Sequence, residues 1–410
     1  MFMKNLAVAQ SGGPTAAINA TLCGVIAEAA ASGKIGRILG ALHGIDGVIA
    51  GKFADLSGLA GNERDMKLLR QTPATALGSC RKKLPNLTSG GDEKVYADIF
   101  TNLAKENIGA FLYIGGNDSM DTVAKLTEYG KMISTGIKFI GVPKTIDNDL
   151  SGTDHTPGFG SAVKYLCTTV QEICRDSNVY DIESVTVIEI MGRDSGWLTA
   201  SCSLLPERCG GKPQLIYLPE KTFYIEKFLS DVRSLHKSGE KTVIAAVSEG
   251  LRDEAGRYAA GRSLSGKRDV FGHEYLAGLG KYIEQEVTDK IGCKVRSIEL
   301  NVCQRCSASL ASKTDLDEAA GAGAAAVRAY LSGETGVMAA MERVSSEPYR
   351  IRYVTVPVSD VANKIKTFPK EWIIPAGNGI EKAAAEYFRP LIQGEENLIC
   401  EDGLPLQITI

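Results

Sequence analysis

The stretch "IGAFLYIGGNDSMDTVAKLTEYGK", residues 108–131, decides the fold class because it joins a strand pattern to a helix pattern through two glycines. The apolar run before the glycines is typical of a buried strand, and the apolar residues after them recur at spacings of three and four, as in a helix. Short apolar runs alternate with helical patterns along the whole chain in the same way. Nearly continuous apolar strands separated by helices predict doubly wound parallel sheets, and therefore an α/β fold.

The turn between this strand and this helix, at Gly115 and Gly116, has the features of an anion site. A helix N-terminus presents unpaired N–H groups, and glycines allow a phosphate to approach the backbone closely. Asp118 follows at once, however, and its carboxylate should repel a phosphate. The stretch therefore raises the question of which phosphate ligand requires an acid at this position.

Length and composition exclude several classes of protein. The chain has 410 residues, 44% of them hydrophobic, which is enough for a large core and for two or three domains. Its 46 basic and 49 acidic residues give a net charge of −3, without a basic stripe for nucleic acid or a polybasic tail for membranes. The opening apolar stretch is too short for a signal peptide, and no window approaches a membrane span, so we expect a cytoplasmic protein.

The cysteines and histidines do not predict a metal or disulfide site. Ten cysteines are scattered along the chain without the dense framework of a secreted protein. Cys303 and Cys306 form a CxxC pair, but no second pair and no adjacent histidine accompany it. The four histidines are dispersed, so we expect no histidine-ligated metal.

A second glycine turn occurs near the start, in "AQSGGPTAAINA", residues 9–20. A strand pattern ends at Gly12 and Gly13, and Pro14 stands where a helix begins, which suits a backbone cradle for phosphate. The same pattern also fits an ordinary tight loop between a strand and a helix. Neither this turn nor "GGNDS" matches a Walker P-loop or the GxGxxG dinucleotide motif.

The stretch "GVPKTIDNDL", residues 141–150, carries the most unusual chemistry. Lys144 and Thr145 follow a strand pattern, and two carboxylates, Asp147 and Asp149, come next. Beside a phosphate, a lysine can neutralise oxygens while a carboxylate accepts a proton from an attacking hydroxyl. The alternative is an Asx-rich turn with a solvated lysine.

Further cationic candidates follow other strand patterns. In "EIMGRDSGWL", residues 189–198, Gly192 allows a ligand to approach and Arg193 can grip a phosphate with two N–H groups. Arg81 in "LGSCRKK" and Arg296 and Arg305 in "VRSIELNVCQR" could add positive charge. Each of these three alone is more often a surface arginine.

Together, these stretches resemble the phosphofructokinase family. "SGG", "LGS", "GGNDS", "PKTIDND", "MGR", "SEG" and "QR" occur in the family's order between about residues 5 and 310. The resemblance implies two doubly wound parallel-sheet domains, a Mg²⁺ cofactor, and phosphoryl transfer to the 1-hydroxyl of fructose 6-phosphate. It also implies a homodimer or homotetramer in which neighbouring subunits share active sites.

The resemblance assigns roles by position. Asp147 would be the base, with Lys144, Thr145 and Asp149 beside the reacting hydroxyl. The residues expected to bind the phosphoryl donor are Gly13, Arg81, Gly116, Asn117, Asp118 and Ser119. Those expected to bind the sugar phosphate are Thr145, Asp147, Asp149, Met191, Gly192, Arg193, Glu249, Arg296 and Arg305.

Asp118 and Lys144 also indicate the branch of the family. Members that use ATP typically have glycines at these two positions, which leaves room for the α-phosphate and ribose. Both positions are filled here, as in the pyrophosphate-dependent branch. Two like charges about 4 Å apart cost roughly 4 kcal/mol at an effective dielectric near 20, so Asp118 should discriminate against an α-phosphate. The answer to the opening question is a short donor, pyrophosphate.

Three positions depart from the family pattern. Asn117 replaces an aspartate associated with Mg²⁺ in many members, so we expect the metal contact at Asp118, or through water, rather than at Asn117. Ser184 replaces an arginine of the sugar-phosphate site, and Val302 replaces a His or Tyr. The sugar site should therefore be rearranged.

The predicted organisation has two domains. We expect a donor domain at 1–157, completed by about 305–345, and a sugar-phosphate domain at 158–304, completed by about 346–410. The predicted activity is a reversible pyrophosphate-dependent phosphofructokinase reaction. The alternatives are an ATP-dependent enzyme and a non-catalytic regulatory subunit; an oxidoreductase is disfavoured because no GxGxxG follows a strand.

Overall fold

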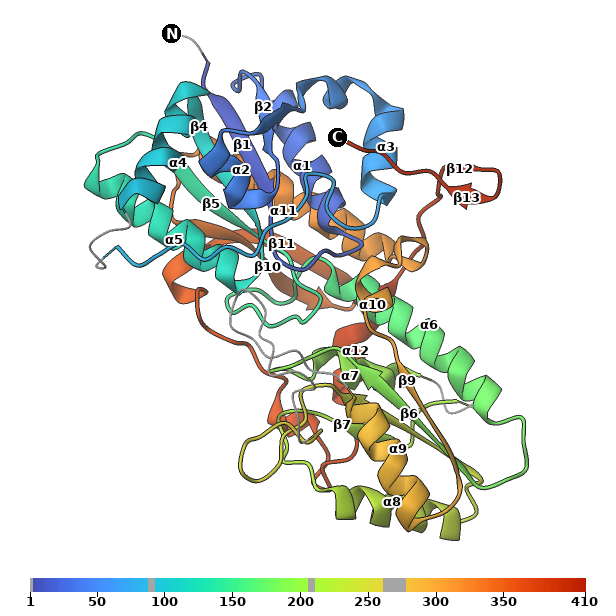
Figure 1. Cartoon of the computed structure of the whole chain (residues 1–410). Coiled ribbons are helices and arrows are strands. Elements are labelled where there is room, and N and C mark those ends of the chain that lie inside the picture. The colour runs from blue at the N-terminus through green and yellow to red at the C-terminus, as the bar shows by residue number, and fades with distance from the viewer. Residues whose placement is uncertain (1–2, 88–92, 206–210, 261–277) are drawn as a thin grey trace.

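The computed structural model describes residues 3–87, 93–205, 211–260 and 278–410. It contains two α/β units, each built around its own sheet, and the long helix α6 (Phe159–Ser177) runs from their junction along the second unit (Figure 1). The predicted α/β class with parallel sheets is confirmed. None of the helices in these ranges is long and apolar enough to cross a membrane.

The first sheet has seven strands in the order β11-β10-β5-β4-β1-β2-β3. Its central strands run parallel, whereas the edge strands β3 and β11 are antiparallel to their neighbours. The strands are β1 (Asn5–Gln10), β2 (Ile38–Ala41), β3 (Phe53–Asp55), β4 (Ile108–Gly115), β5 (Lys138–Pro143), β10 (Val337–Ser346) and β11 (Tyr349–Pro357).

Helices cover both faces of this sheet because its strands are apolar on both sides. Leu6 and Val8 of β1 pack in one core with α1 (Ile18–Ala31), α3 (Glu63–Gln71) and α11 (Lys313–Leu331). The alternate residues Ala7 and Ala9 pack in the opposite core. That second core includes residues of α2 (Gly44–Ala50), α4 (Glu93–Lys105) and α5 (Asn117–Met132).

The second sheet has four parallel strands in the order β7-β8-β6-β9. They are β6 (Ser184–Ile190), β7 (Leu215–Tyr217), β8 (Thr242–Ser248) and β9 (Lys294–Glu299). One face packs against α6, α7 (Trp197–Ala200) and α12 (Ala383–Phe388), and the other against α8 (Ile225–Lys237) and α9 (Leu279–Lys290). The remaining α-helix is α10 (Cys303–Cys306), and the remaining strands β12 (Cys400–Glu401) and β13 (Leu404–Pro405) pair with each other.

The C-terminal part divides between the two units at a different place from the one expected. We predicted that residues from about 346 onward complete the second unit, but β11 forms a hairpin with β10 and is the edge strand of the first sheet. Antiparallel pairing with its sequence neighbour satisfies the backbone of β11 there. Beyond β11, Phe368, Ile373 and Phe388 join the second core. Val358 and Val361 instead pack in one core of the first sheet, and Ile408 packs against its other core.

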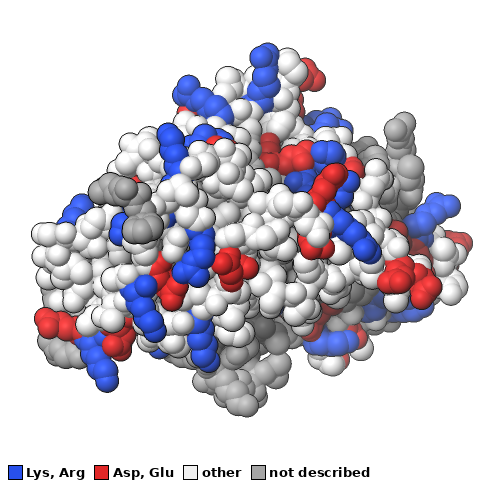
Figure 2. Space-filling model, turned by 90° about the horizontal axis from the view of Figure 1, so that it is seen from above, with Lys and Arg blue, Asp and Glu red and all other residues white. Residues whose placement is uncertain are grey.

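Basic and acidic side chains are interspersed on the face of the molecule seen from above (Figure 2). Figure 2 shows no broad area of one charge sign on that face, in keeping with the small net charge of −3. Concentrated positive charge must therefore be sought locally, inside a pocket.

Candidate active site

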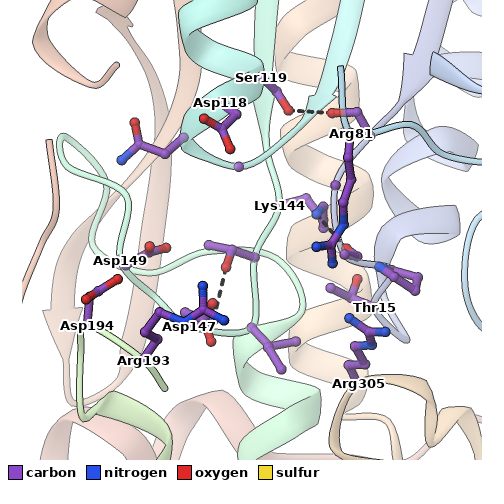
Figure 3. A pocket seen from close by; sticks show the side chains of 18 of the residues that line it. Thr15, Arg81, Asp118, Ser119, Lys144, Asp147, Asp149, Arg193, Asp194 and Arg305 are labelled. Atoms are coloured by element: carbon purple, nitrogen blue, oxygen red, sulfur yellow. Dashed lines mark hydrogen bonds between the residues drawn. The ribbon is translucent and has the colours of Figure 1, made fainter. Parts of the chain in front are cut away.

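A pocket of about 480 Å³ lies where the carboxyl ends of strands from both sheets meet. Its lining follows β1, β4 and β5 in the first sheet and β6 and β8 in the second, which is where ligands bind in open parallel sheets. Figure 3 shows Arg81, Lys144 and Arg305 on one side of the pocket and Asp149 and Asp194 on the other.

The structure brings most of the predicted site residues together in this pocket. The predicted residues in its lining are Gly13, Arg81, Gly116, Asn117, Asp118, Ser119, Lys144, Thr145, Asp147, Asp149, Met191, Arg193, Glu249 and Arg305. Gly192 is not in the lining, but its N–H donates a hydrogen bond of 3.4 Å to Oε1 of Glu249.

Arg296 does not lie in the pocket. It is the third residue of β9, near the amino end of the second sheet, and its guanidinium pairs with Asp176 at 3.2 Å. Ser184 borders the same small hollow as Arg296, while Val302 is 47% exposed next to α10. Within one chain, Arg305 therefore lines the pocket, whereas Arg296 lies at the opposite end of the second sheet's strands.

Lys144 is buried, with 3% exposure, and its Nζ donates a hydrogen bond of 2.7 Å to the carbonyl of Gly13. Burial lowers the pKa of Lys144 to about 8, and the charges of Asp147 and Asp149 partly oppose this shift. The lysine thus contacts the glycine turn at Gly12 and Gly13, and the alternative of a solvated lysine is wrong. A side chain at Gly12 would meet this ammonium, since its Cβ would lie 3.3 Å from Nζ.

The loop that carries the two carboxylates is held by local hydrogen bonds. The N–H of Asp147 donates to Oγ1 of Thr145 at 3.1 Å, a contact drawn in Figure 3. Asn148, between the two acids, has a left-handed backbone with φ of 53° and is fully buried. Its neighbours Asp147 and Asp149 both line the pocket.

Asp147 has the electrostatic character of a base. Burial, together with the negative charges of Asp149 and Glu249, raises the pKa of its carboxyl to about 7, although Lys144 and Arg193 oppose this shift. A carboxyl group with a pKa near neutrality can both accept and return a proton at physiological pH. Burial also raises the pKa of Glu249 and of Asp149.

The N-terminus of α5 carries Asn117 and Asp118, the second of which is the acid expected to repel a phosphate. Oδ1 of Asp118 pairs with Nζ of Lys83 at 3.0 Å. Oδ1 of Asn117 accepts a hydrogen bond of 2.5 Å from the N–H of Asn363, and its Nδ2 donates one of 2.7 Å to the carbonyl of Lys364. Both polar atoms of the Asn117 side chain therefore contact the C-terminal part of the chain.

Several lining residues were not singled out from the sequence: Thr15, Cys80, Lys82, Lys83, Asp194, Asn363 and Ile365. Lys82 and Lys83 directly follow Arg81, so proximity to a chosen residue was an available signal. Asn363 and Ile365 carried no such signal, because only the fold brings them beside α5. Oγ1 of Thr15 and Nε of Arg193 are buried and have no hydrogen-bond partner within the described ranges.

No group of three or more potential metal ligands among His, Cys, Asp and Glu occurs in the residues that the structure describes. The exposed pair Cys303 and Cys306 lies on α10, beside the pocket residue Arg305.

Comparison with known proteins agrees with this architecture. The phosphofructokinase family model matches residues 5–330. The pyrophosphate–fructose 6-phosphate 1-phosphotransferase of Xanthomonas campestris pv. campestris (strain B100) is 41% identical over 99% of this chain and 96% of its own length. A sulfofructose kinase of Alkalicoccus urumqiensis is 30% identical over 87% of this chain and 88% of its own.

A solved structure extends the similarity to the coordinates. The crystal structure of a pyrophosphate-dependent phosphofructokinase from Nitrosospira multiformis superposes with a TM-score of 0.86 and 35% sequence identity. The match covers 99% of this chain and 96% of the other. With the family motifs gathered in one pocket and the family model matching most of its length, this chain belongs to the phosphofructokinase family.

Proposed function

We propose that this protein transfers a phosphoryl group reversibly between pyrophosphate and the 1-hydroxyl of fructose 6-phosphate. The observation that carries the proposal is the joint presence of Asp118 and Lys144 in the pocket that also holds Asp147. The name of the Xanthomonas campestris relative, a pyrophosphate–fructose 6-phosphate 1-phosphotransferase, supports the same reaction.

The donor would bind at the ends of β1 and β4. Backbone N–H groups at Gly13 and Gly116, the hydroxyl of Ser119 and the charge of Arg81 would hold pyrophosphate there. Asp118 and its partner Lys83 stand at the start of α5, where the chain of a longer nucleotide would have to pass. The first unit is accordingly the proposed donor domain.

The sugar phosphate would bind at the ends of β6 and β8. Arg193 and Arg305 offer positive charge, and Glu249 offers a hydroxyl acceptor, within the same pocket. The hydrogen bond of 3.1 Å from the N–H of Met191 to Gln304 fixes the backbone after β6. The second unit is accordingly the proposed sugar domain.

Asp147 would take the proton of the 1-hydroxyl as this oxygen attacks phosphorus, and return it in the reverse direction. Lys144 would stabilise negative charge on the transferred phosphoryl group and on the departing phosphate. Thr145 and Asp149 would line the reacting hydroxyl. Because phosphoryl transfer demands positioning and charge neutralisation above all, a rigid loop at 145–149 suits this reaction.

A Mg²⁺ ion fits the pocket in one way. Magnesium is commonly held by one or two carboxylates together with substrate phosphates, so a dedicated protein cage is not required. Asp118 would hold it, because the ion pair with Lys83 uses Oδ1 and the side chain is 31% exposed. Asn117 does not fit this role, because its amide contacts Asn363 and Lys364. When bound, the ion would neutralise phosphate charge.

Turnover measurements with different donors test the proposal. Formation of fructose 1,6-bisphosphate should occur with pyrophosphate and not at a comparable rate with ATP or ADP. Sulfofructose should be assayed as a second acceptor, since one relative is named for it. Preference for ATP would contradict the proposed donor.

Asp147→Ala should lower turnover by about 10²–10⁴-fold while sugar-phosphate binding persists. An Asp147→Ala variant with more than about a tenth of wild-type turnover would contradict the role of Asp147 as the base.

A further inference from the structure

Residues 363–366, here called the C-terminal strap, run from the N-terminus of α5 to the loop that carries Asp147 and Asp149. We propose that Lys366 in this strap is a positioning residue, which holds the loop at 145–149 in its reactive conformation and couples it to the donor side of the pocket. The inference deepens the proposed function and rests on it for the identity of the reaction.

The backbone of Lys366 is fixed on both sides. Its N–H donates a hydrogen bond of 2.8 Å to the carbonyl of Asp149, and its carbonyl accepts one of 3.0 Å from Nε1 of Trp197. One residue earlier, Ile365 forms an antiparallel bridge with Leu150. The strap is thus paired with the catalytic loop itself, and Trp197 connects it to the second unit.

The side chain of Lys366 uses its full hydrogen-bonding capacity inside the protein. Its Nζ donates to Oδ1 of Asn148 at 3.2 Å and to the carbonyls of Thr153 and Asp154 at 3.2 Å and 2.8 Å. The ammonium also lies 5.0 Å from the ring centre of Trp197. An ammonium has three protons, and here each has an oxygen acceptor.

The hydrogen bond from Lys366 to Asn148 stabilises the backbone between the two carboxylates. Asn148 adopts φ of 53°, a left-handed conformation that asparagine tolerates better than most residues but that glycine adopts more readily. Lys366 holds its amide oxygen, while its Nδ2 donates a hydrogen bond of 2.9 Å to the hydroxyl of Tyr387. That hydroxyl donates onward to the carbonyl of Asp154 at 2.7 Å. Residues far away in sequence therefore enforce the turn between the two acids.

The other end of the strap reaches the donor side. Asn363 donates its N–H to Asn117 and its Nδ2 to Oδ1 of Asp121, the latter at 3.1 Å. Asn363 and Ile365 also line the pocket. The strap thus joins the start of α5 to the catalytic loop. A displacement of α5 would therefore shift the catalytic loop, and the reverse also holds.

The experiment compares Lys366→Met with Lys366→Arg and with Lys370→Met. Lys370 lies four residues further on, is exposed, and serves as a matched control for loss of a lysine charge. For Lys366→Met we expect kcat to fall about 30-fold or more, while the KM values for both substrates stay within about threefold. Lys366→Arg should restore part of kcat, and Lys370→Met should match the wild type.

A second readout does not depend on activity. Hydrogen exchange of the amides at 145–150 should be faster in Lys366→Met than in the wild type, while amides of β1 exchange at unchanged rates. If Lys366→Met fails to fold, Tyr387→Phe removes the other clamp on Asn148 and should lower kcat at unchanged KM.

The outcomes separate the two proposals. A folded Lys366→Met protein with wild-type kcat and unchanged loop exchange would overturn the role of Lys366 and leave the proposed function standing. So would a Tyr387→Phe protein with wild-type kcat in the case where Lys366→Met does not fold. Absence of turnover by the wild type with every donor would reject the proposed function instead, and the exchange rates would still decide the role of the strap.

Discussion

At the scale of the single residue, we expect the half-buried carboxylate of Asp118 to influence which phosphoryl donor binds. It stands at the start of a helix, where an acid is favourable for the helix but unfavourable for a bound phosphate. Lys83 pairs with it at 3.0 Å and limits the room beside it. We therefore expect this position to admit a short donor and to exclude a longer one.

Removing this acid should change donor preference. In Asp118→Gly we expect ATP to become a measurable donor and pyrophosphate to become poorer, because charge repulsion and bulk are lost together with a metal contact. Lys144→Gly should instead damage pyrophosphate use with little gain for ATP. The ratio of kcat/KM for the two donors measures both effects, and the double variant reveals whether they are coupled. An Asp118→Gly ratio within about twofold of wild type, roughly 0.4 kcal/mol, would show that Asp118 is not the selective residue.

His155 illustrates a residue whose environment determines stability rather than chemistry. It is 1% exposed, and its two nitrogens lie 2.8 Å from Asp154 and 2.7 Å from Glu318. Burial alone would lower the pKa of His155, but hydrogen bonds to these two carboxylates and their charges raise it to about 9. The imidazole is therefore charged in the folded protein at neutral pH.

This pKa predicts how stability depends on pH. Because the pKa is higher in the folded than in the unfolded chain, the stabilisation by His155 is complete below about pH 6.5 and is lost as pH rises through about 9. The wild type should lose on the order of 3 kcal/mol of unfolding free energy over this range relative to His155→Gln. Urea unfolding at pH 6.5, 7.5 and 9 measures the difference, and parallel curves for the two proteins would contradict the prediction.

At the scale of the element, two helices on one face of the first sheet approach each other through glycines. A Cβ at Gly24 of α1 would lie 1.8 Å from the carbonyl oxygen of Ala320, and one at Gly323 of α11 would lie 2.1 Å from that of Thr21. The small-residue stretch in α11 thus serves close packing against α1. Any side chain at these positions must push the helices apart.

We expect Gly24→Ala to destabilise the protein by about 1–3 kcal/mol, since overpacking outweighs the gain in helix propensity. Gly136→Ala is the matched control, because a Cβ there would meet nothing within 4 Å. Chemical denaturation of both variants provides the comparison. Equal midpoints and slopes for the two variants would mean that α1 and α11 can separate without cost.

At the scale of the whole molecule, Arg296 faces away from the pocket of its own chain. It lies near the amino end of β9, whereas the pocket lies at the carboxyl ends of the strands. We therefore expect Arg296 to serve the site of a second copy, while Arg305 serves its own. Such sharing makes an isolated subunit incomplete.

Mixed oligomers test this expectation. A chain with Arg296→Ala and a chain with Asp147→Ala should each be nearly inactive alone, and random mixing should restore up to about a quarter of wild-type turnover, since half of the dimers would contain one intact site of two. The mixed species must first be verified by mass. Absence of recovery in verified mixed dimers would exclude a shared site of this kind.

Local patterns in the sequence were sufficient to predict the α/β class, the positions where strands end and about half of the residues that line the pocket. Periodicity identifies strands and helices because side-chain spacing follows backbone geometry, and the carboxyl ends of parallel strands gather at one edge. Lys144, Asp147 and Arg193 could therefore be expected together from motifs alone.

Tertiary structure alone decided the rest. The hairpin of β10 and β11 placed residues 349–357 in the first sheet, and the strap brought Asn363 and Lys366 beside Asn117 and Asn148. These contacts join positions more than 200 residues apart, with separations of 246 and 218. No local pattern encodes such pairs, because each depends on how separately folded units dock and on which buried polar atoms then require partners.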